Sequence, residues 1–174
     1  MGTIFISGSY GVGKTTISHE LSRIFDIPAF QASELITNYT GEQYGATKHV
    51  KNIQTNQDVL IYQVAKTRER FETFILAGHF AIFNKKNEIE KIPRYVFGEL
   101  GITKIILLEA AADKIMLNML KRDNRDYAEK ELIDIARIEY ECAVQISEQI
   151  GVPLYIHKMN YLTDVEDIQN YIKS

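Results

Sequence analysis

The sequence predicts an α/β protein in which one parallel sheet lies between two layers of helices. Short apolar segments rich in β-branched residues alternate with segments of helical periodicity, and this alternation favours parallel strands joined by crossover helices. The chain has 174 residues, of which 45% are hydrophobic and 25% charged, as in a single soluble globular domain. Because no repeat, low-complexity tract or linker interrupts the pattern, we expect one domain over residues 1–174.

Five segments are expected to form the strands of the sheet. The first, residues 3–7, is apolar and ends at a glycine cluster, as a buried strand before a tight loop does. The other four are residues 28–30, 74–77, 103–108 and 152–156. In a sheet of this kind the binding site lies at the carboxyl ends of the strands. We therefore expect functional residues directly after these segments.

Four helices are expected, over residues 15–25, 57–71, 112–120 and 129–150. The longest one has an apolar stripe at helical spacing. The members of that stripe are Leu132, Ala136, Tyr140, Ala143 and Val144. Two segments depart from the strand–helix alternation. Residues 80–92 have a polar turn between apolar arms and predict a β-hairpin on the rim, whereas the polar residues 37–56 predict a flap.

The charge and hydropathy of the chain exclude several classes of protein. A formal net charge of −3 and a pI near 5.8 provide no overall positive field for nucleic acid or an anionic membrane. No segment approaches the roughly 20 apolar residues of a membrane span, and the sequence shows no secretory leader. We expect a cytoplasmic protein, a monomer or small homo-oligomer, whose ligands are small molecules.

The strongest motif lies between the first strand and the first helix. Residues 8–15, Gly-Ser-Tyr-Gly-Val-Gly-Lys-Thr, match the P-loop pattern G-x-x-x-x-G-K-S/T in full and predict a three-layer P-loop NTPase fold. The glycines let backbone N–H groups surround a phosphate, the helix start adds roughly half a positive charge, and Lys14 adds a whole one. The motif predicts ATP, with Mg²⁺ at the Thr15 hydroxyl. The residues expected to bind the nucleotide are Gly8, Gly11, Val12, Gly13, Lys14, Thr15 and Thr16.

The rest of the chain distinguishes among P-loop proteins. Residues 84–87, Asn-Lys-Lys-Asn, lack the final Asp of a guanine-binding motif, and 174 residues leave little room for the helical subdomain of an ATP motor. A small phosphotransferase fits the length. Phosphoryl transfer needs positive charge around the transferred group, which Arg122 and Arg125 would supply from a short lid over residues 121–128. Alternatively, these arginines belong to a solvated charged turn.

With these features the chain resembles the nucleoside monophosphate kinase branch of P-loop kinases, especially the short-lid, adenylate-kinase-like proteins of bacteria and archaea. The resemblance rests on residues 7–16, on Ile-Leu-Ala-Gly-His-Phe at 75–80 and on Arg-Asp-Asn-Arg-Asp at 122–126. It implies a sheet ordered 2-3-1-4-5, ATP and Mg²⁺ on the loop, an acceptor phosphate under the flap and transfer of the γ-phosphoryl group. Lys14, Arg122 and Arg125 are then the catalytic residues.

One position departs from the pattern of that family. Where the family has a carboxylate near the waters of Mg²⁺, this chain has Ala77. Either Thr15, the phosphates and another acid such as Glu109 hold the metal, or the protein is a weakened enzyme. We expect reduced but real turnover. The alternative is a nucleotide-binding regulatory or assembly protein with weak ATPase activity.

The sequence defines the acceptor site less sharply. His79 follows a strand end, and it is the nearest candidate for the general base that a hydroxyl acceptor would need. The resemblance implies that Gln57 reads an acceptor base. Asp58 beside it is equally a helix N-terminal residue that the dipole favours. Lys51 is a candidate for holding an acceptor phosphate and is equally readable as a solvated surface charge.

Overall fold

The computed structural model describes residues 2–40, 53–123 and 128–174. Its main sheet has five parallel strands in the order β2-β3-β1-β6-β7. These strands are β1 (Gly2–Gly8), β2 (Ala29–Gln31), β3 (Thr73–Ala77), β6 (Ile102–Glu109) and β7 (Leu154–Lys158). When the hairpin strands β4 and β5 are left out of the count, this is the order 2-3-1-4-5. The predicted fold class is confirmed.

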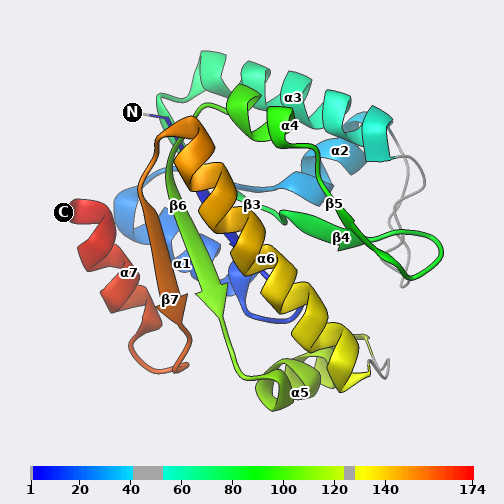
Figure 1. Cartoon of the computed structure of the whole chain (residues 1–174). Helices are drawn as coiled ribbons and strands as arrows, with labels where there is room; N and C mark the ends of the chain where they lie inside the picture. The colour runs from blue at the N-terminus through cyan, green and yellow to red at the C-terminus, as the bar shows by residue number, and fades with distance from the viewer. Residues whose placement is uncertain (1, 41–52, 124–127) are drawn as a thin grey trace.

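Helices cover both faces of this sheet (Figure 1). In the described ranges they are α1 (Lys14–Phe25), α2 (Ala32–Thr40), α3 (Ile53–Arg70), α4 (Arg94–Glu99), α5 (Ala112–Asp123), α6 (Glu129–Ile150) and α7 (Asp164–Lys173). Helices α3, α4 and α6 pack on one face, and α1 and α7 on the other. Within these ranges, no helix is both long and apolar enough to cross a membrane.

The central strand β1 separates two apolar cores. Phe5 points into the core that includes Ala143 of α6, whereas Ile4 and Ile6 point into the core that includes Leu21 of α1. Successive side chains of a strand alternate between the faces of its sheet, which produces this division. Because β1 is buried on both faces, its carboxyl end is a rigid base for the loop that follows.

The hairpin lies within residues 80–92. Its strands β4 (Ala81–Phe83) and β5 (Ile89–Lys91) are antiparallel. Asn84 stabilises the turn between them, because its Oδ1 accepts hydrogen bonds from the N–H groups of Lys86 (2.9 Å) and Glu88 (3.0 Å). Asn87 adopts a left-handed conformation with φ of 63°, which asparagine tolerates well. The Asn-Lys-Lys-Asn sequence is therefore a turn.

The bounds of the flap and the lid differ from the prediction. Helix α2 continues to Thr40 and α3 begins at Ile53, so both ends of the flap predicted over 37–56 are helical. Helix α5 extends to Asp123, so the lid predicted over 121–128 begins inside a helix. These helix ends are polar and carry no apolar periodicity, which is why their sequence resembled loops. The rest of both segments, 41–52 and 124–127, lies outside the described residues.

Candidate nucleotide and acceptor site

The loop between β1 and α1 has the backbone geometry that phosphate binding requires. Gly11 (φ 72°) and Gly13 (φ 113°) adopt left-handed conformations, which a side chain would disfavour. Gly13 is the N-cap of α1, no side chain caps this helix, and no acidic residue stands in its first turn. The first N–H groups of α1 and the positive end of its dipole therefore remain available to an anion.

Lys14 lies across this loop. Its Nζ donates hydrogen bonds to the backbone carbonyls of Gly8 (2.8 Å) and Ser9 (2.9 Å). The ammonium is thereby held close to the uncapped start of α1. Phosphate oxygens at this position would give Lys14 charged partners, which form stronger hydrogen bonds than neutral carbonyls do.

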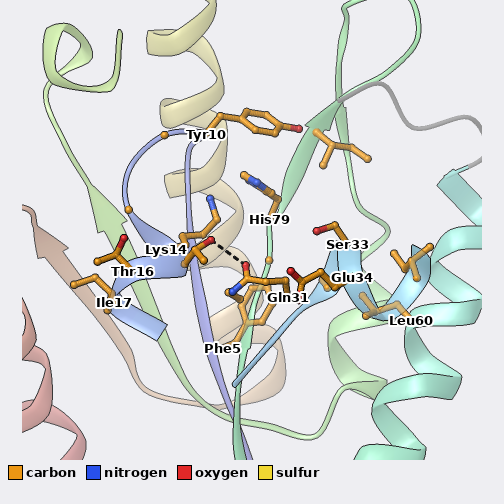
Figure 2. Close-up of a pocket in the computed structure, with 18 of the residues that line it drawn as sticks. Phe5, Tyr10, Lys14, Thr16, Ile17, Gln31, Ser33, Glu34, Leu60 and His79 are labelled. Carbon is orange, nitrogen blue, oxygen red and sulfur yellow. Dashed lines mark hydrogen bonds between the residues drawn. The ribbon is translucent and has the colours of Figure 1, made fainter. Parts of the chain in front are cut away.

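A cavity of about 1160 Å³ opens over the loop. The phosphate loop lines it in the middle, α5 and the loop between β7 and α7 line one side, and β2, α2 and α3 line the other. Figure 2 shows side chains from the loop and from β2 and α2 directed toward this shared space. A cavity of this volume is large enough for a nucleotide and a second small molecule together.

The wall formed by α5 and the β7–α7 loop is fastened to the phosphate loop. Asn118 donates a hydrogen bond from Nδ2 to the Gly11 carbonyl (2.9 Å), and the Tyr161 hydroxyl donates one to the Val12 carbonyl (3.3 Å). The buried Asp164 carboxylate accepts the backbone N–H of Tyr161 at 2.5 Å. These contacts hold the wall in a defined position beside the loop, as a binding site for the nucleoside part of a nucleotide requires.

Two neutral oxygen atoms lie at the position proposed for Mg²⁺. The Thr15 hydroxyl donates to Oε1 of Gln31 at 3.4 Å, and Ala77 is the register partner of Gln31 on the neighbouring strand. Mg²⁺ commonly keeps several water ligands and takes others from substrate phosphates. A hydroxyl and a carboxamide oxygen are compatible with such coordination. The described residues therefore fit Mg²⁺ held mainly by the phosphates of a nucleotide.

Glu109 is not among the residues that line the main cavity. It lies at the end of β6 and lines a second cavity, of about 470 Å³, together with Lys158. Thr15 lines the main cavity instead. In the sheet, β6 is on one side of β1, and β3 and β2 are on the other. The sequence could not show that positions 77 and 109 lie on opposite sides of β1, because each position simply ends an apolar strand segment.

The wall formed by β2, α2 and α3 combines polar groups with an apolar floor. Gln57 is only 3% exposed, and its Oε1 is buried without a hydrogen-bond partner among the described residues; the same holds for Nε2 of Gln31. Glu34 adds a carboxylate to this wall, and Phe5 and Leu60 form apolar surface beneath it. Unpartnered buried polar atoms in a cavity wall need partners from ordered water or from a ligand.

His79 lies between the phosphate loop and this polar wall, under the ring of Tyr10 in Figure 2. The two ring centroids are 4.4 Å apart. Nδ1 of His79 is 3.1 Å from Oε1 of Glu139, a residue of α6. The same Oε1 accepts the backbone N–H groups of Phe80 (3.0 Å) and Ala81 (3.3 Å). Glu139 thus connects α6 to the segment that carries His79.

The Glu139 carboxyl group has an unusual affinity for its proton. Burial raises the pKa of Glu139 to about 8, although the Lys14 ammonium and the N–H groups of Phe80 and Ala81 act in the opposite direction. The carboxyl group therefore exchanges its proton near neutral pH. Groups with strongly shifted pKa values inside a cleft are frequent at functional sites.

Comparison with known proteins places the chain in a family. A family model described as an AAA domain matches residues 7–136, which is more than half of the chain and includes the phosphate loop. The chain belongs to this AAA-domain family. None of the curated proteins matches it by sequence.

Solved structures with the same fold as this AAA-domain protein include several kinases. It is similar to a shikimate kinase from Acinetobacter baumannii in complex with shikimate, at 16% identity and a TM-score of 0.67 over 99% of this chain and 92% of that one. A deoxyadenosine kinase from M. mycoides has 15% identity and a TM-score of 0.60 over 98% of each chain. A gluconokinase from Sinorhizobium meliloti 1021 has 12% identity and a TM-score of 0.55, over 99% of this chain and 97% of that one.

The remaining residues selected from the sequence do not all reach the cavity of the AAA-domain protein. Asp58 is exposed at the surface of α3 and accepts a hydrogen bond from the Tyr95 hydroxyl at 3.5 Å, outside the cavity lining. Arg122 belongs to the last turn of α5, but its side chain is not described. Lys51 and Arg125 lie outside the described residues. The resemblance-based roles of these three basic residues therefore stay predictions.

Sequence reasoning missed Glu139, although a signal was present. The buried positions of α6 are Leu132, Ile135, Glu139, Cys142, Ala143 and Ile146. The stripe predicted through Tyr140 was therefore rotated about the helix, and Tyr140 is 43% exposed. In the observed stripe Glu139 occurs at a position where helical spacing calls for an apolar residue. A charged residue on an apolar stripe must have a specific partner in the core.

The side chain at position 77 provides a test of the Mg²⁺ site predicted for the AAA-domain protein. In the variant Ala77→Asp, a carboxylate is added beside Gln31 and close to Thr15. We expect the apparent Mg²⁺ affinity in an ATP turnover assay to rise about tenfold. Groups that hydrogen-bond to metal ligands typically change metal affinity by about 10- to 100-fold. Ala77→Asn is the uncharged control. Equal rates and equal Mg²⁺ dependence in Ala77→Asp and the wild type would show that position 77 has no part in metal binding.

Proposed function

We propose that this chain is an ATP-dependent kinase that phosphorylates a small molecule. The observation that carries the proposal is the continuous cavity that joins the phosphate loop to the polar wall of β2, α2 and α3. ATP on Lys14 and the loop amides, and an acceptor against Gln57 and Glu34, would share one space. Direct phosphoryl transfer needs such proximity. The fold shared with shikimate kinase, gluconokinase and deoxyadenosine kinase supports the proposal.

The residues of the phosphate loop have distinct roles in this proposal. Lys14 and the N–H groups at the start of α1 would bind the β- and γ-phosphates, and the Thr15 hydroxyl would hold Mg²⁺. The metal would supply further positive charge to the phosphates. Arg122, in the last turn of α5, and Arg125 would stabilise the charge of the transferred group, as cationic side chains do in phosphoryl transfer.

Two classes of acceptor draw support from different parts of the chain. A nucleoside monophosphate, which the sequence favours, would take its phosphate contacts from Lys51. In the described part of the cavity, however, the only lining side chains that carry or can gain a positive charge are Lys14 and His79, and Glu34 adds a negative one. This part of the wall favours an uncharged, hydroxyl-bearing acceptor over a phosphate.

A coupled assay of ADP release tests the function. Its acceptor panel contains AMP, CMP, GMP and UMP as phosphate acceptors, and shikimate, gluconate and deoxyadenosine as hydroxyl acceptors. We expect at least one compound to raise ADP release above the rate with ATP alone, and mass spectrometry to detect its phosphorylated product. ADP release that no acceptor stimulates would contradict the kinase. It would favour a nucleotide-binding regulatory protein with weak ATPase activity, the alternative that the missing acid at Ala77 supports.

A further inference from the structure

Glu139 is a buried carboxyl group, and its contacts with the backbone do not require an ionisable side chain. Oε1 contacts Nδ1 of His79 and two backbone N–H groups of the β3–β4 segment. Oε2 is buried and has no hydrogen-bond partner within the described residues. Burying an ionisable group is costly, and a glutamine would accept the same two backbone hydrogen bonds at lower cost. The remaining contact, with the imidazole of His79, is therefore the one that gives an ionisable side chain at position 139 a role.

The contact with Glu139 determines which nitrogen of His79 carries the proton. Oε1 of Glu139 accepts two backbone N–H groups and is therefore the acceptor toward the imidazole as well, so Nδ1 of a neutral His79 keeps its hydrogen, and the basic lone pair is on Nε2. The ring of Tyr10 packs on the imidazole at a tilt of 32° and restrains its rotation. His79 is 18% exposed and lines the main cavity, whereas Glu139 is 1% exposed behind it. The pair thus has a buried member and a cavity-facing member.

We propose that Glu139 and His79 form the proton-accepting pair of a kinase whose acceptor is an alcohol. The inference rests on the proposed kinase function and names the substrate class of its acceptor site. In the reaction, the acceptor O–H bond breaks and its proton moves to Nε2 of His79. The acceptor oxygen bonds to the γ-phosphorus of ATP, and the bond from that phosphorus to the β–γ bridging oxygen breaks. ADP leaves with that electron pair. Glu139 is a positioning residue that stabilises the imidazolium.

Lys14 connects this pair to the nucleotide. Its ammonium lowers the pKa of Glu139 and so favours the deprotonated pair. Phosphates bound to Lys14 would offset that charge, and the pair would then hold a proton more tightly. The base therefore becomes stronger when ATP is bound, which is when the reaction needs it.

Other titratable groups also face the pair. Tyr10 packs on His79 from the phosphate loop, and Glu109 and Lys158 line the second cavity together with Glu139. On α6 itself, the neighbouring groups are Arg137, Tyr140 and Cys142. Each of these groups contributes to the electrostatic field at His79 and Glu139, so the test compares variants that differ only at these two residues.

The first test follows the imidazole of His79 and does not depend on turnover. The full chain is labelled with ¹³C-histidine, and His79→Gln assigns the signal of this residue among the four histidines. In Glu139→Gln we expect the pKa of His79 to fall by about one unit or more, because the imidazolium loses a carboxylate within hydrogen-bond reach. Glu141→Gln, which removes an exposed carboxylate paired with Arg137 on the same helix, is the control without a shift. Equal His79 pKa values in the wild type and Glu139→Gln overturn the pair.

The second test uses whichever hydroxyl acceptor of the panel turns over. For the wild type, kcat is expected to rise with pH as the pair loses its proton. In Glu139→Gln this rise moves to lower pH, and kcat falls. In His79→Gln the rise disappears, and kcat falls about 100-fold or more with little change in KM. Thermal melts of the variants verify folding, and the carboxamide introduced by Glu139→Gln still offers an oxygen to the N–H groups of Phe80 and Ala81.

The outcomes separate this inference from the kinase proposal. If only the nucleoside monophosphates turn over, and His79→Gln retains their rate, the alcohol acceptor is wrong while the kinase stands. If no compound stimulates ADP release, both proposals fail, whatever the NMR titration shows. If kcat for a hydroxyl acceptor has the same pH profile in the wild type and in Glu139→Gln, only the positioning role of Glu139 is overturned.

Discussion

Lys14→Met is expected to lower kcat about 10²- to 10³-fold and to weaken ATP binding. The substitution keeps an unbranched side chain of similar length but removes the ammonium that lies across the phosphate loop, 2.8 Å from the Gly8 carbonyl. Preorganised charges of this kind contribute about 3 to 4 kcal/mol to the stabilisation of a transition state. The loss also removes the charge that lowers the pKa of Glu139, so the pKa of that carboxyl rises further.

Steady-state kinetics and ATP titration by calorimetry would measure this effect. The matched control is Lys66→Met on α3, because Lys66 is exposed and pairs only locally with Glu69 in the described structure. We expect the control to keep the wild-type rate, since exposed ion pairs contribute little. A Lys14→Met protein that keeps its rate within a factor of three would exclude Lys14 from the transfer step.

Gly8→Ala is expected to lower the free energy of unfolding by about 2 to 4 kcal/mol. Gly8 has a φ of 144°, and a Cβ atom at this position would lie 2.4 Å from the backbone carbonyl oxygen of Leu108 on β6. It would also be 3.0 Å from the side chain of Val12. Neither β6 nor the loop can move aside easily, because Gly8 and Leu108 are register partners in the centre of the sheet.

Urea denaturation of both proteins at one pH measures this difference. Gly98→Ala in α4 is the matched control, because a Cβ atom there meets nothing within 4 Å and the φ of Gly98 is not positive. We expect the control to stabilise the protein by about 0.5 to 1 kcal/mol, since alanine is the better helix former. If Gly8→Ala unfolds at the same urea concentration as the wild type, the backbone at position 8 is not restricted to glycine.

Most of the fold could be predicted from patterns among neighbouring residues. The strands in the sheet centre have unbroken apolar runs, and the phosphate loop is a contiguous motif, so both are visible in a few neighbouring residues. The strand order 2-3-1-4-5 came from the family resemblance instead. Helices α2, α4 and α7 escaped prediction because they are short, so their periodicity spans few turns.

The acceptor side of the site was predicted less well, for a geometric reason. His79 and Gln57 follow or begin predicted elements and do line the cavity. Glu139 is 60 positions from His79 in the sequence, and only the rotation of α6 about its axis brings them together. An error of one position in the predicted stripe was enough to place Glu139 on the surface. Gln31 and Glu34 lie at and just after the end of a three-residue strand, which a sequence pattern locates poorly.

The two walls of the main cavity have independent origins along the chain. The polar wall comes from β2, α2 and α3, which precede β3, whereas the opposite wall comes from α5 and the β7–α7 loop. Asn118 and Tyr161 tie only the latter wall to the phosphate loop. Exchanging the early segment between relatives would therefore reshape one half of the cavity and leave the contacts of the other half intact. For the proposed kinase, one continuous stretch of sequence would then determine which acceptor fits.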